Sequence, residues 1–269
     1  MSSRIVKMGY ALALLCIIAG LVYFFASNWP VLGREVKVAI SIAAMVGFYG
    51  IGAVLKRFRH FLGRWMLIGG TLSFGIALAL LGQIYNSHAD SYWLFLVWLV
   101  PTALLALLTN DRMLSVIAVA LLQLTCWFYY FPSAYNMEWT EWASFGWLLL
   151  FAAVNGVLAG VIRVPWTAYL AYAAMHGWLL TIGITGFSYG RDVWWPYVYA
   201  ALSAGLLYYF FAVKKQRTYA LLTSLFAGLF LLIQYIRLLS DYDEIWMYLT
   251  GLAVAAAVLY GGIVLFKRS

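Results

Sequence analysis

The sequence has very little charge for its length. Only 10% of its 269 residues are charged, 66% are hydrophobic, and the mean hydropathy is +0.91. A water-soluble fold would have too little polar surface to cover itself, so the bilayer must be the solvent. A hydrocarbon core of about 30 Å requires roughly 20 apolar residues per helix, which allows about ten spans and leaves no stretch for a soluble domain.

Cysteine and proline are scarce as well. Cys16 and Cys126 both lie in apolar runs, so we expect two free thiols. Of the five prolines, Pro101 is the one near the middle of a predicted helix, where it frees a backbone carbonyl and predicts a kink. Arg4 and Lys7 precede an apolar run in the manner of a signal peptide, but the run is long for one, and we expect a retained first helix.

Long apolar runs are what the sequence does contain. They do not alternate as the strands of a membrane barrel would, so the predicted fold class is all-α, a polytopic transmembrane helix bundle. We predict ten helices, at 9–28, 36–55, 65–83, 92–109, 113–131, 143–162, 166–186, 193–213, 218–237 and 246–266.

The distribution of charge predicts the orientation. With both termini cytoplasmic, only four of the 17 Lys and Arg residues fall on the outer side, and of the nine Asp and Glu residues only Asp111 falls on the inner side. Lys and Arg are retained on the cytoplasmic side of membrane proteins. The net charge of +8 is therefore a topology signal, and we expect no nucleic-acid partner. The whole chain is expected to form one integral membrane domain.

No Asp or Glu lies in the interior of a predicted span, which weakens the case for an obligatory proton or sodium carrier. The interior does contain Gln123, Asn155 and His176. Asn155 and His176 lie at similar depths on neighbouring helices, so a hydrogen bond between them is feasible. His176 is either a neutral ring satisfied by Asn155 or a carbonyl, or a group that relays protons or contacts substrate.

The stretch from 65 to 93 is the best candidate for a site. Its glycine-rich apolar run ends in hydrogen-bonding and ionisable residues with no Lys or Arg among them, notably Gln83, Tyr85, His88 and Asp90. Gln83 and Gln234 each line a cavity or tie two helices together. Tryptophans gather toward the outer face, as an interfacial belt or as the lining of an outer vestibule.

Basic residues on the outer side leave two further alternatives. Arg34, Lys37 and Arg237 either pair with nearby acids or hold an anionic head group, for which the Arg fork is well suited. The acids of the outer loops show no spacing that identifies a metal and no nucleophile with a partnered base. We therefore expect no metal, no cofactor and no catalytic residues.

Two short motifs carry a family resemblance. Ala26-Ser27-Asn28-Trp29 closes the first predicted helix ahead of Arg34, and Gly82-Gln83-Ile84-Tyr85 is followed by Asp90. In these features roughly the first half of the chain, about 1–140, resembles a family of bacterial predicted membrane proteins catalogued as domain of unknown function 2157. The resemblance implies a multi-pass protein of the bacterial inner membrane, carries no settled activity, and implies importance for Asn28, Trp29, Arg34, Gln83, Tyr85 and Asp90.

The leading hypothesis is a permease-like protein with an outward-facing polar and aromatic cavity for a polar or lipid-linked solute. The candidate substrate-binding residues are Asn28, Trp29, Arg34, Gln83, Tyr85, His88, Asp90, Gln123, Asn155, His176, Gln234 and Arg237. The first alternative is a non-transporting scaffold or assembly subunit, acting as a homo-oligomer or with a partner subunit. The second is an enzyme at the outer face of the membrane. In every case the lipid bilayer is a partner.

Overall fold

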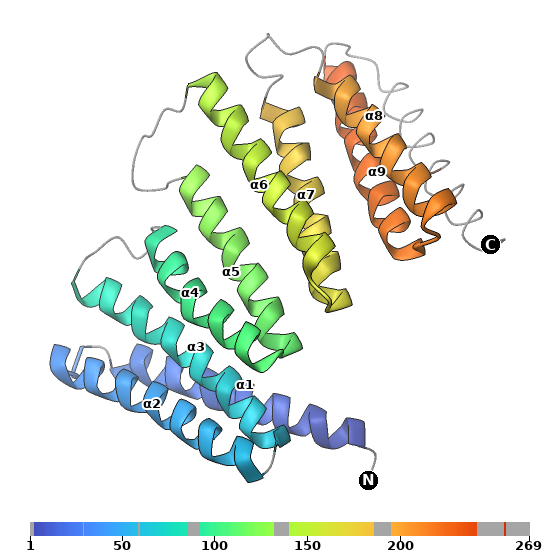
Figure 1. Cartoon of the computed structure of the whole chain (residues 1–269). Coiled ribbons are helices and arrows are strands. Elements are labelled where there is room, and N and C mark those ends of the chain that lie inside the picture. The colour runs from blue at the N-terminus through green and yellow to red at the C-terminus, as the bar shows by residue number, and fades with distance from the viewer. Residues whose placement is uncertain are drawn as a thin grey trace. The chain divides into compact units, whose positions relative to one another are not determined.

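A computed structural model of the chain describes residues 3–28, 30–58, 60–85, 92–131, 140–185, 195–240 and 256. These residues form helices joined by short turns, and none of them forms a strand (Figure 1). The helices are α1 Ser3–Asn28, α2 Arg34–Phe58, α3 His60–Ile84, α4 Tyr92–Thr109, α5 Arg112–Tyr130, α6 Glu141–Val161, α7 Pro165–Thr185, α8 Trp195–Tyr208, the π-helix η2 Tyr209–Val213, and α9 Arg217–Ser240.

The all-α prediction is confirmed, and the first nine predicted helices each correspond to an observed one. The tenth, at 246–266, lies outside the described residues. The described helices provide eight segments long and apolar enough to cross a membrane, one of them α8 together with η2, and α7 is not among them. Because the described helices do not include the last predicted span, the count of ten and the cytoplasmic placement of both termini stay predictions.

Three helices differ clearly from their predicted form. α1 begins at Ser3 and not at 9. α3 begins at His60 and not at 65, so it includes Arg64, whose guanidinium pairs with Asp111. The helix predicted at 193–213 loses its α-helical geometry after Tyr208 and ends in the π-helix η2. Such π-turns are rare and occur mostly as single turns within α-helices. α4 runs through Pro101 without interruption.

The chain divides into two compact units, 1–138 and 139–269. The boundary between them lies close to the end of the stretch that resembles the family, about 1–140. In the first unit α3 is the central helix, since it contacts α1, α2 and α4. More than half of its apolar window, 56%, is buried, against 33% or less in each of the other candidate spans.

Two glycines of α3 lie where a group of a neighbouring helix approaches too closely for a side chain. A Cβ on Gly63 would lie 2.4 Å from the backbone nitrogen of Lys56 on α2, and one on Gly75 would lie 2.3 Å from the Trp98 ring on α4. Trp98 also donates its indole N–H to the Thr71 carbonyl over 2.9 Å. Glycine at these positions therefore lets a backbone and an aromatic ring pack directly against the helix.

The sequence also predicts two packing surfaces made of small residues at a spacing of four, one at Ala39, Ala43 and Gly47 and one at Ala152, Gly156 and Gly160. On α2, Ala39 and Ala43 are exposed and nothing lies within 4 Å of a Cβ on Gly47, so the described part of the unit does not pack against this stripe. On α6, Ala152 is buried and Gly156 faces the Met175 thioether, as predicted, but nothing lies within 4 Å of a Cβ on Gly160.

In the second unit α7 is central, because α6, α8 and α9 all pack against it. It is also the described long helix that fails the hydropathy criterion for a membrane span. Its buried side chains include the polar groups of Thr167, Tyr172 and His176.

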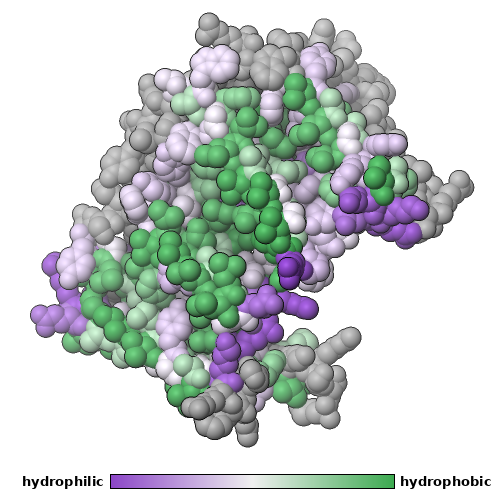
Figure 2. All heavy atoms as spheres, in the orientation of Figure 1, coloured by the Kyte–Doolittle hydropathy of each residue, from purple (hydrophilic) through white to green (hydrophobic). Residues whose placement is uncertain are grey.

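The exteriors of both units suit a bilayer. Figure 2 shows hydrophobic side chains along the helices, with the most hydrophilic ones gathered near helix ends. Large apolar side chains are widely exposed, for example Leu107, Leu108 and Val161. The two free thiols are confirmed, with Cys16 exposed and Cys126 buried.

Candidate functional site

The outer residues predicted to form a vestibule do not turn into the interior of the first unit where the structure describes them. Asn28 donates from Nδ2 to the Phe24 carbonyl of its own helix over 2.9 Å. Arg34 at the start of α2 is exposed, as are Gln83 and Tyr85 at the end of α3. Trp29, His88 and Asp90 lie outside the described residues.

The predicted polar residues of the spans are placed on three helices. Gln123 on α5 donates to the Val119 carbonyl one turn earlier, over 3.4 Å. Gln234 on α9 is partly buried, and its Nε2 lacks a hydrogen-bond partner in the part of the chain described. Arg237 lies near the end of the same helix. Whether any of these residues contacts a substrate stays a prediction.

The hydrogen bond between His176 and Asn155 that the sequence makes feasible is not formed. Asn155, fully buried on α6, donates from Nδ2 to the Phe151 carbonyl over 2.8 Å. His176 instead lies 3.1 Å through Nδ1 from the hydroxyl of Tyr199 on α8. Similar depth made the Asn155 pair feasible, but an amide can satisfy itself on its own helix, and the His176 ring turns toward α8 and α9.

His176 is enclosed by aromatic rings. Its ring stacks on Phe226 of α9 with centroids 5.4 Å apart and meets Tyr172 edge to face at 4.9 Å. The side chain is fully buried, and Nε2 has no hydrogen-bond partner among the described residues. In either neutral tautomer Nδ1 is hydrogen-bonded to Tyr199, so Nε2 is left either as an acceptor without a donor or as an N–H without an acceptor. Such a buried unsatisfied group costs about 1–3 kcal/mol.

A second hydrogen bond joins α7 to α9 one turn away. The Tyr172 and Thr223 hydroxyl oxygens are 2.7 Å apart. Thr223 donates its hydroxyl proton to the Tyr219 carbonyl, 2.9 Å away, so Tyr172 must be the donor to Thr223. The direction of this bond is thereby fixed, and the Tyr172 ring is held against His176.

These rings form what we call the aromatic column, a chain of ring contacts through the second unit. Consecutive centroids lie 4.8 to 6.1 Å apart, within the usual range for aromatic pairs. Its members are Tyr219, Tyr172, His176, Phe226, Tyr199 and Phe230. Phe210 of η2 stacks on Tyr219 at its end, 4.9 Å away. The column surrounds the ionisable ring of His176 with apolar faces and two phenol groups.

His176 is an interior polar residue, as predicted, whereas Tyr172, Tyr199 and Thr223 were not predicted as site residues. Tyr172 lies one turn before His176 on α7, a spacing that could have linked the two, but Tyr199 and Thr223 come from α8 and α9. A signal was present in the number of Tyr and Thr residues inside helices that are otherwise apolar, but that signal does not say which residues meet.

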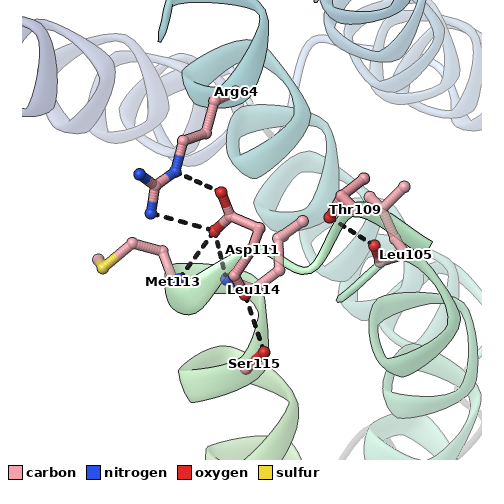
Figure 3. Close-up of polar contacts among 7 residues, drawn as sticks. All are labelled: Arg64, Leu105, Thr109, Asp111, Met113, Leu114 and Ser115. Carbon is pink, nitrogen blue, oxygen red and sulfur yellow. Dashed lines mark hydrogen bonds and ion pairs between the residues drawn. The ribbon is translucent and has the colours of Figure 1, made fainter. Parts of the chain in front are cut away.

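A second polar cluster lies at one end of the first unit, and the sequence analysis did not select it as a site. There Arg64 of α3 forms an ion pair with Asp111, the residue before α5 (Figure 3). Asp111 also accepts the backbone N–H groups of Met113 and Leu114, over 2.8 and 3.1 Å, and so caps α5. The preceding residue, Asn110, has a φ of 50°, the left-handed conformation that ends α4.

These groups line an open pocket of about 190 Å³. Its polar lining is Lys56, Arg64, Thr109 and Asp111, and Leu67 and Leu114 supply apolar walls. The signal that could have found it is that Asp111 is the single acid among the basic residues of the predicted inner side. The structure gives that acid a specific cation.

Metal ligands are not grouped in the described part of the chain, where no set of three His, Cys, Asp or Glu side chains could hold an ion. The loop acids raised by the sequence analysis lie mostly outside those residues, with Glu141 at the start of α6. That the protein uses no metal or cofactor stays a prediction.

Fold and surface together define a multi-spanning helical membrane protein, since eight described helices can span a bilayer and large apolar side chains cover their outer faces. Residues 2–115 match the family described as predicted membrane protein DUF2157, which confirms the resemblance over α1 to α4 and the first residues of α5. No curated protein and no solved structure matches the chain.

Proposed function

We propose that the protein is permease-like, and that the second unit binds a polar or lipid-linked solute beside His176. One observation carries the proposal. His176 is the one His or charged residue in the middle of a described helix, it is fully buried, and its Nε2 has no partner there. Ionisable groups inside a membrane are costly and commonly mark substrate or ion pathways.

The aromatic column supports this assignment. A ring nitrogen flanked by Tyr172 and Phe226 could hydrogen-bond a hydroxyl or amide of a solute while the rings cover its apolar faces. Because the site is fully buried, loading requires α8 or α9 to move, as in alternating access. η2, where the regular hydrogen bonding of α8 changes, is a natural place for such a movement.

Vesicle experiments test the proposal. The purified chain would be reconstituted and tested for uptake of labelled sugars and amino acids, and for flipping of a fluorescent phospholipid measured by dithionite quenching. We expect at least one probe to cross faster than in protein-free vesicles. His176→Phe should abolish that gain, whereas Tyr208→Phe, at an exposed position of α8, should not. A gain that survives His176→Phe would contradict the proposal.

A scaffold function is the second candidate, because the small-residue stripe of α2 is exposed. Ala39, Ala43 and Gly47 present a smooth face of the kind that lets helices approach closely. Substituting Leu for Ala43 should then dissociate an oligomer or a co-purifying subunit, detected by size-exclusion chromatography with light scattering. Unchanged mass would argue against this function. We do not propose an enzymatic activity. From the family resemblance we propose that the protein is located in the bacterial inner membrane.

A further inference from the structure

We propose that the pocket formed by Lys56, Arg64, Thr109 and Asp111 binds the phosphate group of an anionic ligand. This site lies wholly in the first unit and is independent of the His176 hypothesis. Two cations and one carboxylate line the pocket, so it carries a net charge of one positive unit. Its volume of about 190 Å³ is sufficient for a phosphate with part of the group attached to it.

Asp111 does not consume the donors that a phosphate would need. Its carboxylate accepts two backbone N–H groups of α5 and two contacts from Arg64, through Nε and one terminal nitrogen. A guanidinium has five N–H donors, so three remain for a ligand. Asp111 therefore holds Arg64 in place at the pocket and leaves part of its donor fork available.

Lys56 supplies the second cation. Its side chain is partly buried and makes no hydrogen bond or ion pair within the described residues. Its position is fixed, because the backbone at Lys56 packs directly on Gly63 of α3. A partly buried ammonium without a partner costs free energy, and an oxyanion between Lys56 and Arg64 would offset that cost.

The surroundings favour a lipid as the source of the phosphate. The predicted topology places this end of the unit on the cytoplasmic side, where anionic phospholipids give the membrane surface its negative potential. Leu107 and Leu108, in the same turn of α4 as Thr109, are 79% and 82% exposed. They offer apolar surface to the acyl chains of a lipid whose head group lies in the pocket.

Thermal unfolding of the purified full chain in neutral detergent provides the test. It would be titrated with dioctanoyl phosphatidylglycerol, with dioctanoyl phosphatidylcholine, and with inorganic phosphate against chloride at equal ionic strength. We expect phosphatidylglycerol to raise the melting temperature and phosphatidylcholine to leave it unchanged. A comparable rise with inorganic phosphate alone would keep the phosphate site but assign it to a soluble ligand.

Three variants separate the pocket from general surface charge. Lys56→Gln should weaken the apparent affinity for phosphatidylglycerol about tenfold. Lys56→Arg, which keeps the charge, should restore it. Arg163→Gln removes an exposed cation from the α6–α7 turn and should behave as the unmodified chain. If Lys56→Gln binds as tightly as the unmodified chain, or if Arg163→Gln loses as much affinity, the pocket is not the site.

Discussion

The two central helices, α3 and α7, are buried by different means. α3 is enclosed because glycines remove its side chains and allow the α2 backbone and the Trp98 ring to reach the helix. α7 is enclosed by large side chains, Tyr172, His176 and Trp178 among them, which carry polar atoms into the interior. The difference indicates that α3 is built for close packing, whereas α7 holds polar groups whose presence packing alone does not explain.

The largest expected effect breaks the packing of α3. Gly63→Ala places a methyl group against the Lys56 backbone, which cannot rotate away, and should lower the free energy of unfolding by about 3 kcal/mol. The matched change on α7, Gly177→Ala, meets nothing within 4 Å. It should leave stability unchanged or raise it by up to about 1 kcal/mol, the helix propensity of Ala over Gly. Denaturant unfolding in detergent measures the free energy of unfolding of both variants. An equal loss of stability in the two variants would contradict this account of α3.

Removing the His176 ring should have the next largest effect. His176→Ala leaves a cavity among Tyr172, Tyr199 and Phe226 and should cost about 2 kcal/mol of unfolding free energy. Thr181→Ala, on the same helix, removes a smaller and less buried side chain and serves as the control. The same unfolding assay applies, and comparable losses in both variants would mean that the His176 ring is not a packed part of the core.

A double-mutant cycle sharpens the account of the polar bond in the aromatic column. Tyr199→Phe leaves Nδ1 of His176 without its partner and should cost about 1 kcal/mol. His176→Phe leaves the Tyr199 hydroxyl unpaired but also removes the unsatisfied Nε2, so its cost should be smaller. The double variant should recover most of that loss, because both polar partners are gone and the rings remain. Strictly additive losses would show that the bond contributes nothing to stability.

The smallest expected effect concerns the ion pair at the end of α3. Asp111→Asn keeps a residue able to cap α5 but removes the charge that pairs with Arg64, and should cost about 0.5 kcal/mol, less at high salt. Asp111→Ala also removes the cap and should cost about 1 kcal/mol more. If both variants have the same free energy of unfolding, the capping hydrogen bonds of Asp111 do not contribute to stability.

The sequence predicted most of the fold, because each span is defined by its own apolar run. Polar or proline interruptions such as Arg112 and Pro165 predict the first residues of α5 and α7 to within one residue. Two kinds of local geometry were not predictable. The apolar run does not show that α3 extends through the charged Arg64 to His60, and the π-turn of η2 has no pattern of hydrophobicity that distinguishes it from an α-helix.

The candidate sites were predicted less well than the helices. His176 was recognisable by itself, since an ionisable side chain in an apolar span stands out. Its partner Tyr199 was not, because the contact depends on how α7 and α8 rotate about their axes, which hydropathy does not specify. The phosphate pocket was missed because Lys56 and Arg64 were attributed to topology, and charges at helix ends carry no sign of whether they converge.

The most direct test of the account is transport by the double variant His176→Phe with Tyr199→Phe. This chain should fold with nearly the stability of the unmodified protein, so a defect in vesicles cannot be ascribed to unfolding. The account predicts that the solute or lipid probe moved by the unmodified protein crosses no faster than in protein-free vesicles. A stable double variant that transports at the unmodified rate would show that the polar centre of α7 serves packing alone.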